Sequence, residues 1–412
     1  MAQTVPPTNV RYHYIDLMKG IACLLMLLGH GFRVWMVYHL NDTYRVLMYL
    51  CDFSGPMFFF ASGMNIHTFI DRNQHKLNFR MDRFYVMSAL VLFFLSNVYS
   101  FSVKAPGLPN IFHAVAMSTV FVYFLIRKKV PNSVIFAIAV ALYMVYLPWR
   151  MGITPNYETI ENYAGRPFAI LLLINFSFLP WVCFFITGAV AFKATTKLST
   201  GILIGIFSLM FASSFLFPKI VTFDTTTQLL FRGVPTYMLQ TVGFSGLFYF
   251  FLRKVYHGAK NNRMLQTLEF WGKESFLFLI VHFFFLFLLP FPLVWLYGYY
   301  ENVNGWLFTV LLFVFTLFSM PLTMRLRDRL AQKKRFITIS VITIIFVWFS
   351  TAYFYSIPKI ALLAIFWSYI GSFAFAFSYP SIRKYLRKRY DNTSSDVPIE
   401  PAAPQSEEPK TT

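Results

Sequence analysis

Charged residues are scarce in this chain. Aspartate, glutamate, lysine and arginine make up 13% of its 412 residues, whereas about a quarter of an ordinary soluble domain is charged. Hydrophobic residues reach 57%, and phenylalanine alone occurs 51 times. The apolar residues gather in runs of roughly 18 to 25, the length of a helix that crosses a hydrocarbon core about 30 Å thick. The composition excludes an ordinary soluble domain and predicts a polytopic integral membrane protein.

Cysteine is nearly absent too. The three cysteines, Cys23, Cys51 and Cys183, fall within apolar runs, so they form no disulfide framework and match no metal-ligand spacing. We expect no metal site. Residues 1–15 lack the basic start, the short apolar segment and the small-residue cleavage site of a secretory signal. The first apolar run is therefore expected to be an uncleaved membrane anchor.

Acidic residues are the scarcer charge, at 17 against 36 lysines and arginines, for a net charge of +19. Such an excess suggests a nucleic acid or an anionic surface as partner. The positions of the basic residues indicate topology instead. We predict twelve membrane spans, over residues 16–38, 46–70, 84–103, 110–126, 133–149, 172–192, 199–217, 235–252, 273–290, 304–324, 336–356 and 359–379.

The segments between these spans alternate in charge. On one side of the membrane these segments are rich in lysine and arginine. The other side holds only eight of the 36, namely Arg33, Arg45, Lys104, Arg150, Arg166, Lys219, Arg232 and Lys359. By the positive-inside rule the rich side faces the cytoplasm, and an even number of spans places both termini there. No loop is long enough to fold a nucleic-acid-binding module, so we expect no nucleic-acid partner.

The predicted fold class is all-α, a polytopic transmembrane bundle of about 10–12 helices with both termini cytoplasmic. One membrane domain covers residues 1–390, because the loops leave no room for a soluble catalytic domain. Residues 391–412 are rich in Pro, Glu and Ser, which predicts a disordered cytoplasmic tail. The last four spans are the least well defined, because Pro290 and Pro292 interrupt residues 286–300.

Ionisable residues inside membrane spans are the first candidates for function. His30 follows Lys19 by eleven residues, about 16 Å along a helix, which places it in the outer half of the first span. Asp52 lies in the outer half of the second span, which runs the opposite way, so it is expected at a similar depth. A carboxylate at that depth needs a partner, and Asp52 holding a ring nitrogen of His30 would fix its tautomer and raise its basicity.

A second histidine falls near mid-membrane. His282 lies ten residues beyond Gly272 in the ninth predicted span, so two imidazoles and one carboxylate can line one cavity. Either histidine could also serve only as a hydrogen bond between helices. His67 and His113 lie near the predicted interfaces, where ordinary solvation is expected.

Several motifs resemble membrane-bound acyltransferases. The opening Asp16-Leu-Met-Lys19-Gly20, with His30 eleven residues after Lys19, is similar to the Arg-x10-His signature of the acyltransferase-3 family, with Lys in place of Arg. Asp52-Phe-Ser-Gly-Pro56, followed by Gly63, resembles the heparan-α-glucosaminide N-acetyltransferase catalytic-domain family. The lysine keeps the charge but loses the planar fork of arginine.

Later motifs extend the resemblance to about residue 290. Pro180-Trp181, followed by Gly188, is similar to a Pro-Trp span of the second family. The segment from Gly272 through Ser275 to His282 resembles the late helix found across both families. The pair Arg80 and Arg83 resembles the basic opening of their third helix, whereas residues 300–412 match no motif.

The resemblance implies transfer of an acyl group, expected to be acetyl, from cytoplasmic acyl-CoA to a hydroxyl or amine of a glycan or lipid-linked sugar. It implies His30 as general base or transient acyl carrier, Asp52 as its orienting partner, and His282 as an assisting group that contacts the thioester. Polar and cationic residues of the inner side would hold the coenzyme, namely Lys19, Arg72, Arg80, Arg83, Lys273 and Ser275.

Two other function classes remain open. A 12-helix secondary transporter would use His30 and Asp52 as a proton relay, although we find no match between the two halves of the chain. A non-catalytic sensor or scaffold would tolerate loss of His30 and His282. For location, the short loops favour a bacterial inner membrane.

Overall fold

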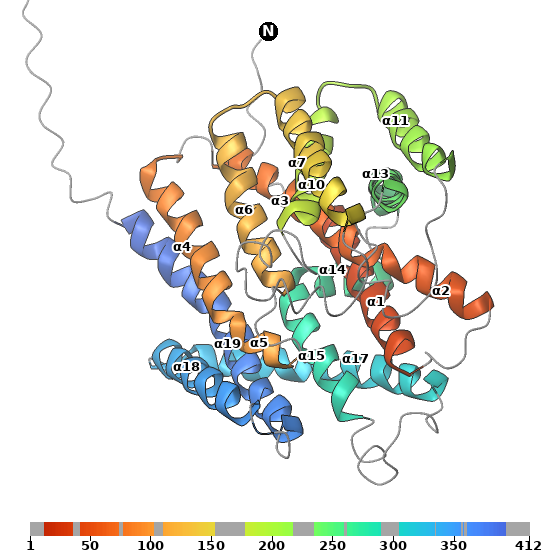
Figure 1. The fold of residues 1–412 in the computed structure, drawn as a ribbon. Coiled ribbons are helices and arrows are strands. Elements are labelled where there is room, and N and C mark those ends of the chain that lie inside the picture. The colour runs from red at the N-terminus through yellow and green to blue at the C-terminus, as the bar shows by residue number, and fades with distance from the viewer. Residues whose placement is uncertain are drawn as a thin grey trace, which may run out of the picture.

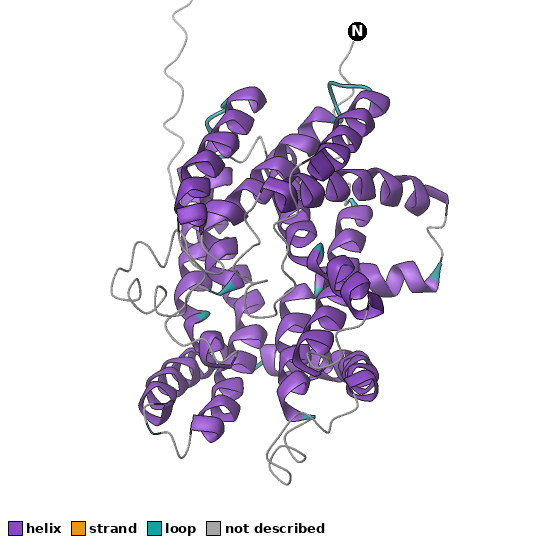
Figure 2. Cartoon of the chain, turned by 45° about the vertical axis from the view of Figure 1, so that its right-hand side comes forward, coloured by secondary structure: helices purple, strands orange, loops and turns teal. Residues whose placement is uncertain are grey.

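The computed structural model describes residues 12–35, 42–73, 77–102, 110–152, 178–216, 235–258, 262–289, 305–333, 335–355, 357 and 361–392. Within these ranges every regular element is a helix (Figures 1 and 2), so the predicted all-α fold class is confirmed. The helices are α1 (His13–Trp35), α2 (Asp42–Asp52), α3 (Ser54–Arg72), α4 (Phe79–Leu95), α5 (Asn97–Ser102), α6 (Ile111–Arg127), α7 (Asn132–Gly152), α10 (Phe178–Ala194), α11 (Thr200–Ser213) with the 3-10 turn η2 (Ser214–Leu216), α13 (Pro235–Gly258), α14 (Arg263–Lys273), α15 (Ser275–Leu288), α17 (Gly305–Ala331), α18 (Phe336–Tyr355) and α19 (Ala361–Asn392).

Five helical segments of the described chain are long and apolar enough to cross a membrane, and a bent helix pair makes a sixth if it counts as one span. The five are His13–Phe32, Val46–Asp71, Phe79–Ser100, Gly305–Ala331 and Phe336–Phe354. Shorter apolar helices accompany them, among them α6, α10 and α11. The protein is therefore a multi-pass membrane protein. The predicted tail from residue 393 onward, together with Pro290 and Pro292, lies outside the described residues.

Two of the predicted spans contain a one-residue interruption of the regular helix, although each remains a single apolar segment, Val46–Asp71 and Phe79–Ser100. The second divides at Phe53 into α2 and α3, and the third divides at Ser96 into α4 and α5. The ninth predicted span, 273–290, corresponds to α15, but the helix that precedes it was not predicted. A separate helix, α14, runs to Lys273, and the chain then turns by 89° at Glu274 before α15 begins. The amphipathic sequence of α14 hid this element, because its polar residues give it no apolar run.

Side-chain caps explain where two of the helices in the membrane domain begin. Asn78 precedes α4, and its side-chain oxygen accepts a hydrogen bond from the amide of Met81 at 3.0 Å. Asn110 precedes α6 and accepts from the amide of His113, whose Nδ1 in turn accepts from the amide of Asn110. This reciprocal capping box buries His113, so the solvated position expected for it is wrong.

Two pairs of helices approach each other at glycines, as small residues allow in membrane proteins. A Cβ added to Gly20 of α1 would lie 1.7 Å from the carbonyl oxygen of Leu268 in α14, and one added to Gly272 would lie 1.7 Å from that of Asp16. In the same way, a Cβ on Gly63 of α3 would lie 1.9 Å from the carbonyl oxygen of Phe185 in α10. Gly20, Gly63 and Gly272 therefore allow the close packing of these helices.

We predict that Gly20→Ala lowers the free energy of unfolding by about 3 kcal/mol, because the new methyl group forces the backbones of α1 and α14 apart. Gly201→Ala in α11 is the matched control, since a Cβ there would meet nothing within 4 Å. Thermal unfolding of the purified chain in detergent micelles measures both. Equal midpoints for Gly20→Ala and wild type would contradict the close crossing.

Candidate functional site

Two histidines from distant parts of the chain meet inside the bundle. His30 lies in α1 and His282 in α15, and His30 Nδ1 is 3.0 Å from His282 Nε2. Their rings are nearly parallel, with centroids 5.2 Å apart and an interplanar angle of 9°. His282 is fully buried and His30 is half-buried. The structure thus brings together the two histidines that the sequence singled out.

The hydrogen bonds of His282 determine which nitrogen of His30 acts as a base. His282 Nδ1 lies 3.0 Å from the carbonyl oxygen of Phe278, and a carbonyl can only accept. With both rings neutral, His282 therefore donates from Nδ1 and accepts at Nε2, so His30 donates from Nδ1. The lone pair of His30 is then on Nε2. This is the tautomer that a general base or a nucleophile requires.

Asp52 lies near the level of Gly29 and His30 along α1. It ends α2, and the preceding Cys51 packs so closely on α1 that a Cβ added to Gly29 would lie 2.8 Å from its Cβ. The backbone oxygen of Asp52 accepts a hydrogen bond of 2.9 Å from the hydroxyl of Tyr237 in α13. The pairing of the Asp52 carboxylate with His30 stays a prediction.

A cavity of about 440 Å³ lies between α1, α3, α4, α6, α15 and α19, and extends toward the histidine pair. Ligand sites usually have volumes of about 300–1,000 Å³. One end is apolar and includes Met26, Phe112 and Phe278. Met26 precedes His30 by four residues and Phe278 precedes His282 by four, about one helical turn each. The apolar end therefore stops one turn short of both histidines.

The other end of the cavity is polar. Its lining includes Asp16 and Lys19 of α1, Asn65 of α3, Ser275 of α15 and Arg383 of α19. Both ends lie along the same helices, so the cavity changes from charged and polar to apolar along its length. Such a graded lining suits a ligand that has an anionic head and a slender, less polar arm.

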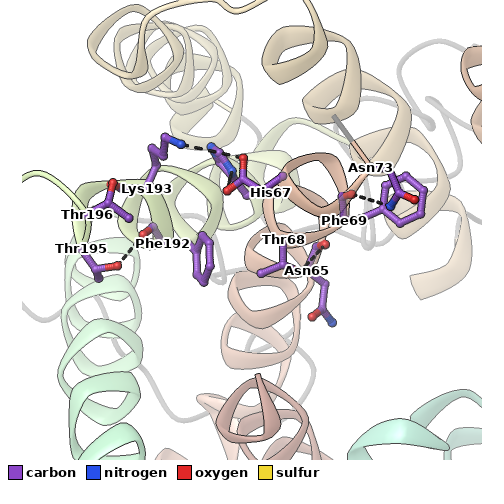
Figure 3. Close-up of polar contacts among 10 residues, drawn as sticks. Asn65, His67, Thr68, Phe69, Asn73, Phe192, Lys193, Thr195 and Thr196 are labelled. Carbon is purple, nitrogen blue, oxygen red and sulfur yellow. Dashed lines mark hydrogen bonds and ion pairs between the residues drawn. The ribbon is translucent and has the colours of Figure 1, made fainter. Parts of the chain in front are cut away.

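The end of α3 separates the cavity from a second polar group (Figure 3). Asn65 lines the cavity and points away from His67, which lies on the side of Lys193. His67 Nδ1 lies 3.3 Å from Asp71 Oδ2, and Lys193 Nζ lies 3.8 Å from Asp71 Oδ1. His67 is 5% exposed, so its expected solvated position at the interface is wrong. This group joins α3 to α10 and lies outside the cavity.

A polar cluster fixes α14 to its neighbours. Glu269 of α14 is buried; its Oε1 lies 2.7 Å from His13 Nδ1, and its Oε2 accepts a hydrogen bond of 3.1 Å from the Tyr256 hydroxyl. Lys273 forms an ion pair with the same carboxylate. Burial and the nearby Glu269 charge raise the pKa of Tyr256 to about 12, so its hydroxyl remains a donor at neutral pH. Lys273 therefore serves this cluster and does not line the cavity.

An arginine holds the bend that precedes α15. Arg327 of α17 donates from Nη1 and Nη2 to the two carboxylate oxygens of Glu274, at 2.5 and 3.4 Å. Glu274 is the residue at which α14 ends and the chain turns by 89°. A two-pronged contact of this kind fixes direction as well as distance. The bend in turn directs α15 so that His282 faces His30.

The residues proposed to hold the coenzyme are divided by the structure. Lys19 and Ser275 line the cavity, and the Lys19 ammonium also lies 5.6 Å from the centroid of the Phe58 ring. Arg80 and Arg83 lie in the first turns of α4 outside this lining. Arg72 ends α3, and its side chain lies outside the described residues.

The last helix, α19, contributes to the cavity, which the sequence motifs did not indicate. Tyr379 and Arg383 of α19 line the cavity, although residues 300–412 match no motif. One signal was present in the sequence. The last apolar run continues past Pro380 into Arg383, so one helix carries a cation at the end of a membrane span.

Comparisons with known proteins find no family model, no curated protein and no solved structure that matches this chain.

We predict that Arg327→Met lowers the free energy of unfolding by about 2 kcal/mol, because the Glu274 carboxylate loses two charge-assisted hydrogen bonds. Arg329→Met is the matched control, since Arg329 is an exposed arginine on the same helix. Thermal unfolding in micelles compares the two variants. If both lower the midpoint equally, the contact with Glu274 does not hold the bend.

Proposed function

We propose that this protein is an integral membrane acyltransferase that moves an acyl group, acetyl in the first instance, from acyl-CoA to a hydroxyl or amine of a glycan or lipid-linked sugar. The observation that carries the proposal is the histidine pair. His282 is fixed by the carbonyl of Phe278 and accepts from His30, which leaves a lone pair on His30 Nε2. Acyl transfer to a hydroxyl or amine requires such a base.

The chemistry uses this nitrogen in one of two ways. In direct transfer, His30 Nε2 takes the proton of the acceptor hydroxyl while its oxygen attacks the thioester carbonyl. The carbon–sulfur bond then breaks, and the departing thiolate receives the proton from His30. In the covalent route, His30 Nε2 attacks the thioester carbonyl first, the carbon–sulfur bond breaks, and coenzyme A leaves as the thiolate. The acceptor oxygen or nitrogen then attacks the acyl group, the bond to His30 Nε2 breaks, and the proton of the acceptor passes to the thiolate. In both routes His282 stabilises the positive charge that develops on His30.

The cavity supports acyl-CoA as the donor. Its polar end carries Lys19 and Arg383, which suit the phosphates of the coenzyme. Its apolar end suits the thioester arm and leads toward His30 and His282. Asp16, on the same wall as Lys19, keeps the lysine charge directed into the cavity in this proposal.

The proposal includes the topology expected from the sequence. In a bundle of about 10–12 spans with both termini cytoplasmic, the end of α1 that carries Asp16 and Lys19 faces the cytoplasm, where acyl-CoA is found. The histidine pair then lies in the outer half of the membrane, within reach of an acceptor on the far side. A bacterial inner membrane and a glycan acceptor fit this arrangement.

The proposed activity predicts that His30→Ala reduces acyl transfer about 100-fold or more, the usual contribution of a general base. Radiolabelled acetyl-CoA is supplied to membranes that contain the wild type or the variant at matched expression, and label is counted in lipids and glycans. His282→Ala is expected to reduce transfer as well, because His30 loses the acceptor that fixes its tautomer.

His67→Asn is the matched control, because it removes another buried histidine outside the cavity and should retain activity. Equal label in wild type and His30→Ala would remove His30 from the chemistry. Wild-type membranes without label would contradict transfer from acetyl-CoA. Proton-coupled flux in proteoliposomes would then test the transporter, in which His30 and Asp52 relay protons.

A further inference from the structure

Helices α4 and α6 carry a second hollow region outside the central cavity. Two adjoining hollows form it, and both are lined by Val86 of α4 and by Phe124 and Lys128 at the end of α6. We call the two together the α4–α6 groove. The groove has a charged end and an apolar end, so it is amphipathic like the central cavity. The charged residues of the groove do not line the central cavity.

The charged end of the groove is cationic. Its lining includes Arg83, Arg127 and Lys128, with Asp82 as the one acidic residue that lines it. Asp82 is already engaged, since it accepts hydrogen bonds from the Tyr123 hydroxyl at 2.6 Å and from Arg127 Nε at 3.2 Å. This end of the groove therefore keeps an excess of positive charge.

Arg83 and Lys128 supply that excess. Both are exposed, and neither forms an ion pair with the part of the chain that the structure describes. The Arg83 guanidinium lies 4.3 Å from the centroid of the Phe79 ring, which holds it beside the groove. Lys128 caps the end of α6, where a cation also interacts favourably with the helix dipole.

The other end of the groove is a trough of apolar side chains, with a volume of about 590 Å³. Lys128 is the one charged residue in its lining, which otherwise includes Leu90, Phe93, Met117, Val120 and Phe121. Met117 precedes Lys128 by eleven residues, about 16 Å along α6. This distance is about half of the roughly 30 Å hydrocarbon core, the depth of one leaflet.

We propose that the α4–α6 groove binds an anionic phospholipid, whose phosphate contacts Arg83 and Lys128 and whose acyl chain lies in the trough. Charge complementarity at one end and an apolar trough one leaflet deep at the other both match this class of lipid. Basic pockets between membrane helices on the positive side of a protein bind anionic head groups in this way. The proposal is independent of acyl transfer, since it uses neither the histidine pair nor the central cavity.

The test measures phospholipid binding to the purified full chain in detergent micelles by native mass spectrometry. Phosphatidylglycerol and phosphatidylcholine with identical chains are titrated against the wild type and Arg83→Gln/Lys128→Gln. The double variant is expected to bind phosphatidylglycerol on the order of tenfold more weakly, with phosphatidylcholine binding unchanged. Lys197→Gln/Arg263→Gln removes the same charge at exposed positions outside the groove and should stay within about twofold of wild type.

A second variant tests the trough without changing the charge. Val86→Trp fills the point where the two hollows meet, and it should weaken phosphatidylglycerol binding about as much as the charge variant. Ile206→Trp, at an exposed position of α11, is its control. Unchanged elution and melting in lipid-free micelles confirm that each variant folds.

Three results would overturn the proposal. The first is equal phosphatidylglycerol binding by the wild type and the Arg83→Gln/Lys128→Gln variant. The second is a loss of phosphatidylcholine binding that matches the loss of phosphatidylglycerol binding. The third is binding of coenzyme A or inorganic phosphate in lipid-free micelles with the same dependence on Arg83 and Lys128, which would make the site one for a soluble anion.

Discussion

The crossing of α1 and α14 at two glycines is the contact on which the candidate site depends. Gly20 and Gly272 bring the two backbones so close that neither position has room for a methyl group. This contact fixes the level of α14 along α1. The bend at Glu274, held by Arg327, then fixes the direction of α15. Each residue of α15 consequently has a defined height on α1, and His282 meets His30.

The packing of α1 against α14 also buries the carboxylate of Glu269 inside the bundle. Glu269 lies on α14 beside α1. Its carboxylate contacts His13 of α1, Tyr256 of α13 and Lys273 of α14. A carboxylate taken out of water destabilises a fold unless partners compensate it. These three partners compensate the buried carboxylate, so Glu269 stabilises the position of α14 and does not line the cavity.

Sequence periodicity and polarity were sufficient for the class of fold and for the two histidines, because isolated polar groups in apolar runs are conspicuous. They failed at α14, where an amphipathic helix has no apolar run to reveal it. They also failed for Arg383, whose place in the cavity depends on how α19 packs against α4. Long-range packing decides which of many interfacial cations face a cavity, and local sequence does not carry that information.

Helices α4 and α6 lie between the central cavity and the apolar trough of the α4–α6 groove. Ala89 and Ala116 line both the central cavity and the apolar trough, so the wall between them is made of small side chains at that level. Asp82 and Arg127 tie the two helices together near the cationic end, with Tyr123 donating to the same carboxylate. The wall is thus held by polar bonds at one end and is thin at the level of the two alanines. Any change that spreads α4 from α6 must work against the Asp82 contacts with Tyr123 and Arg127.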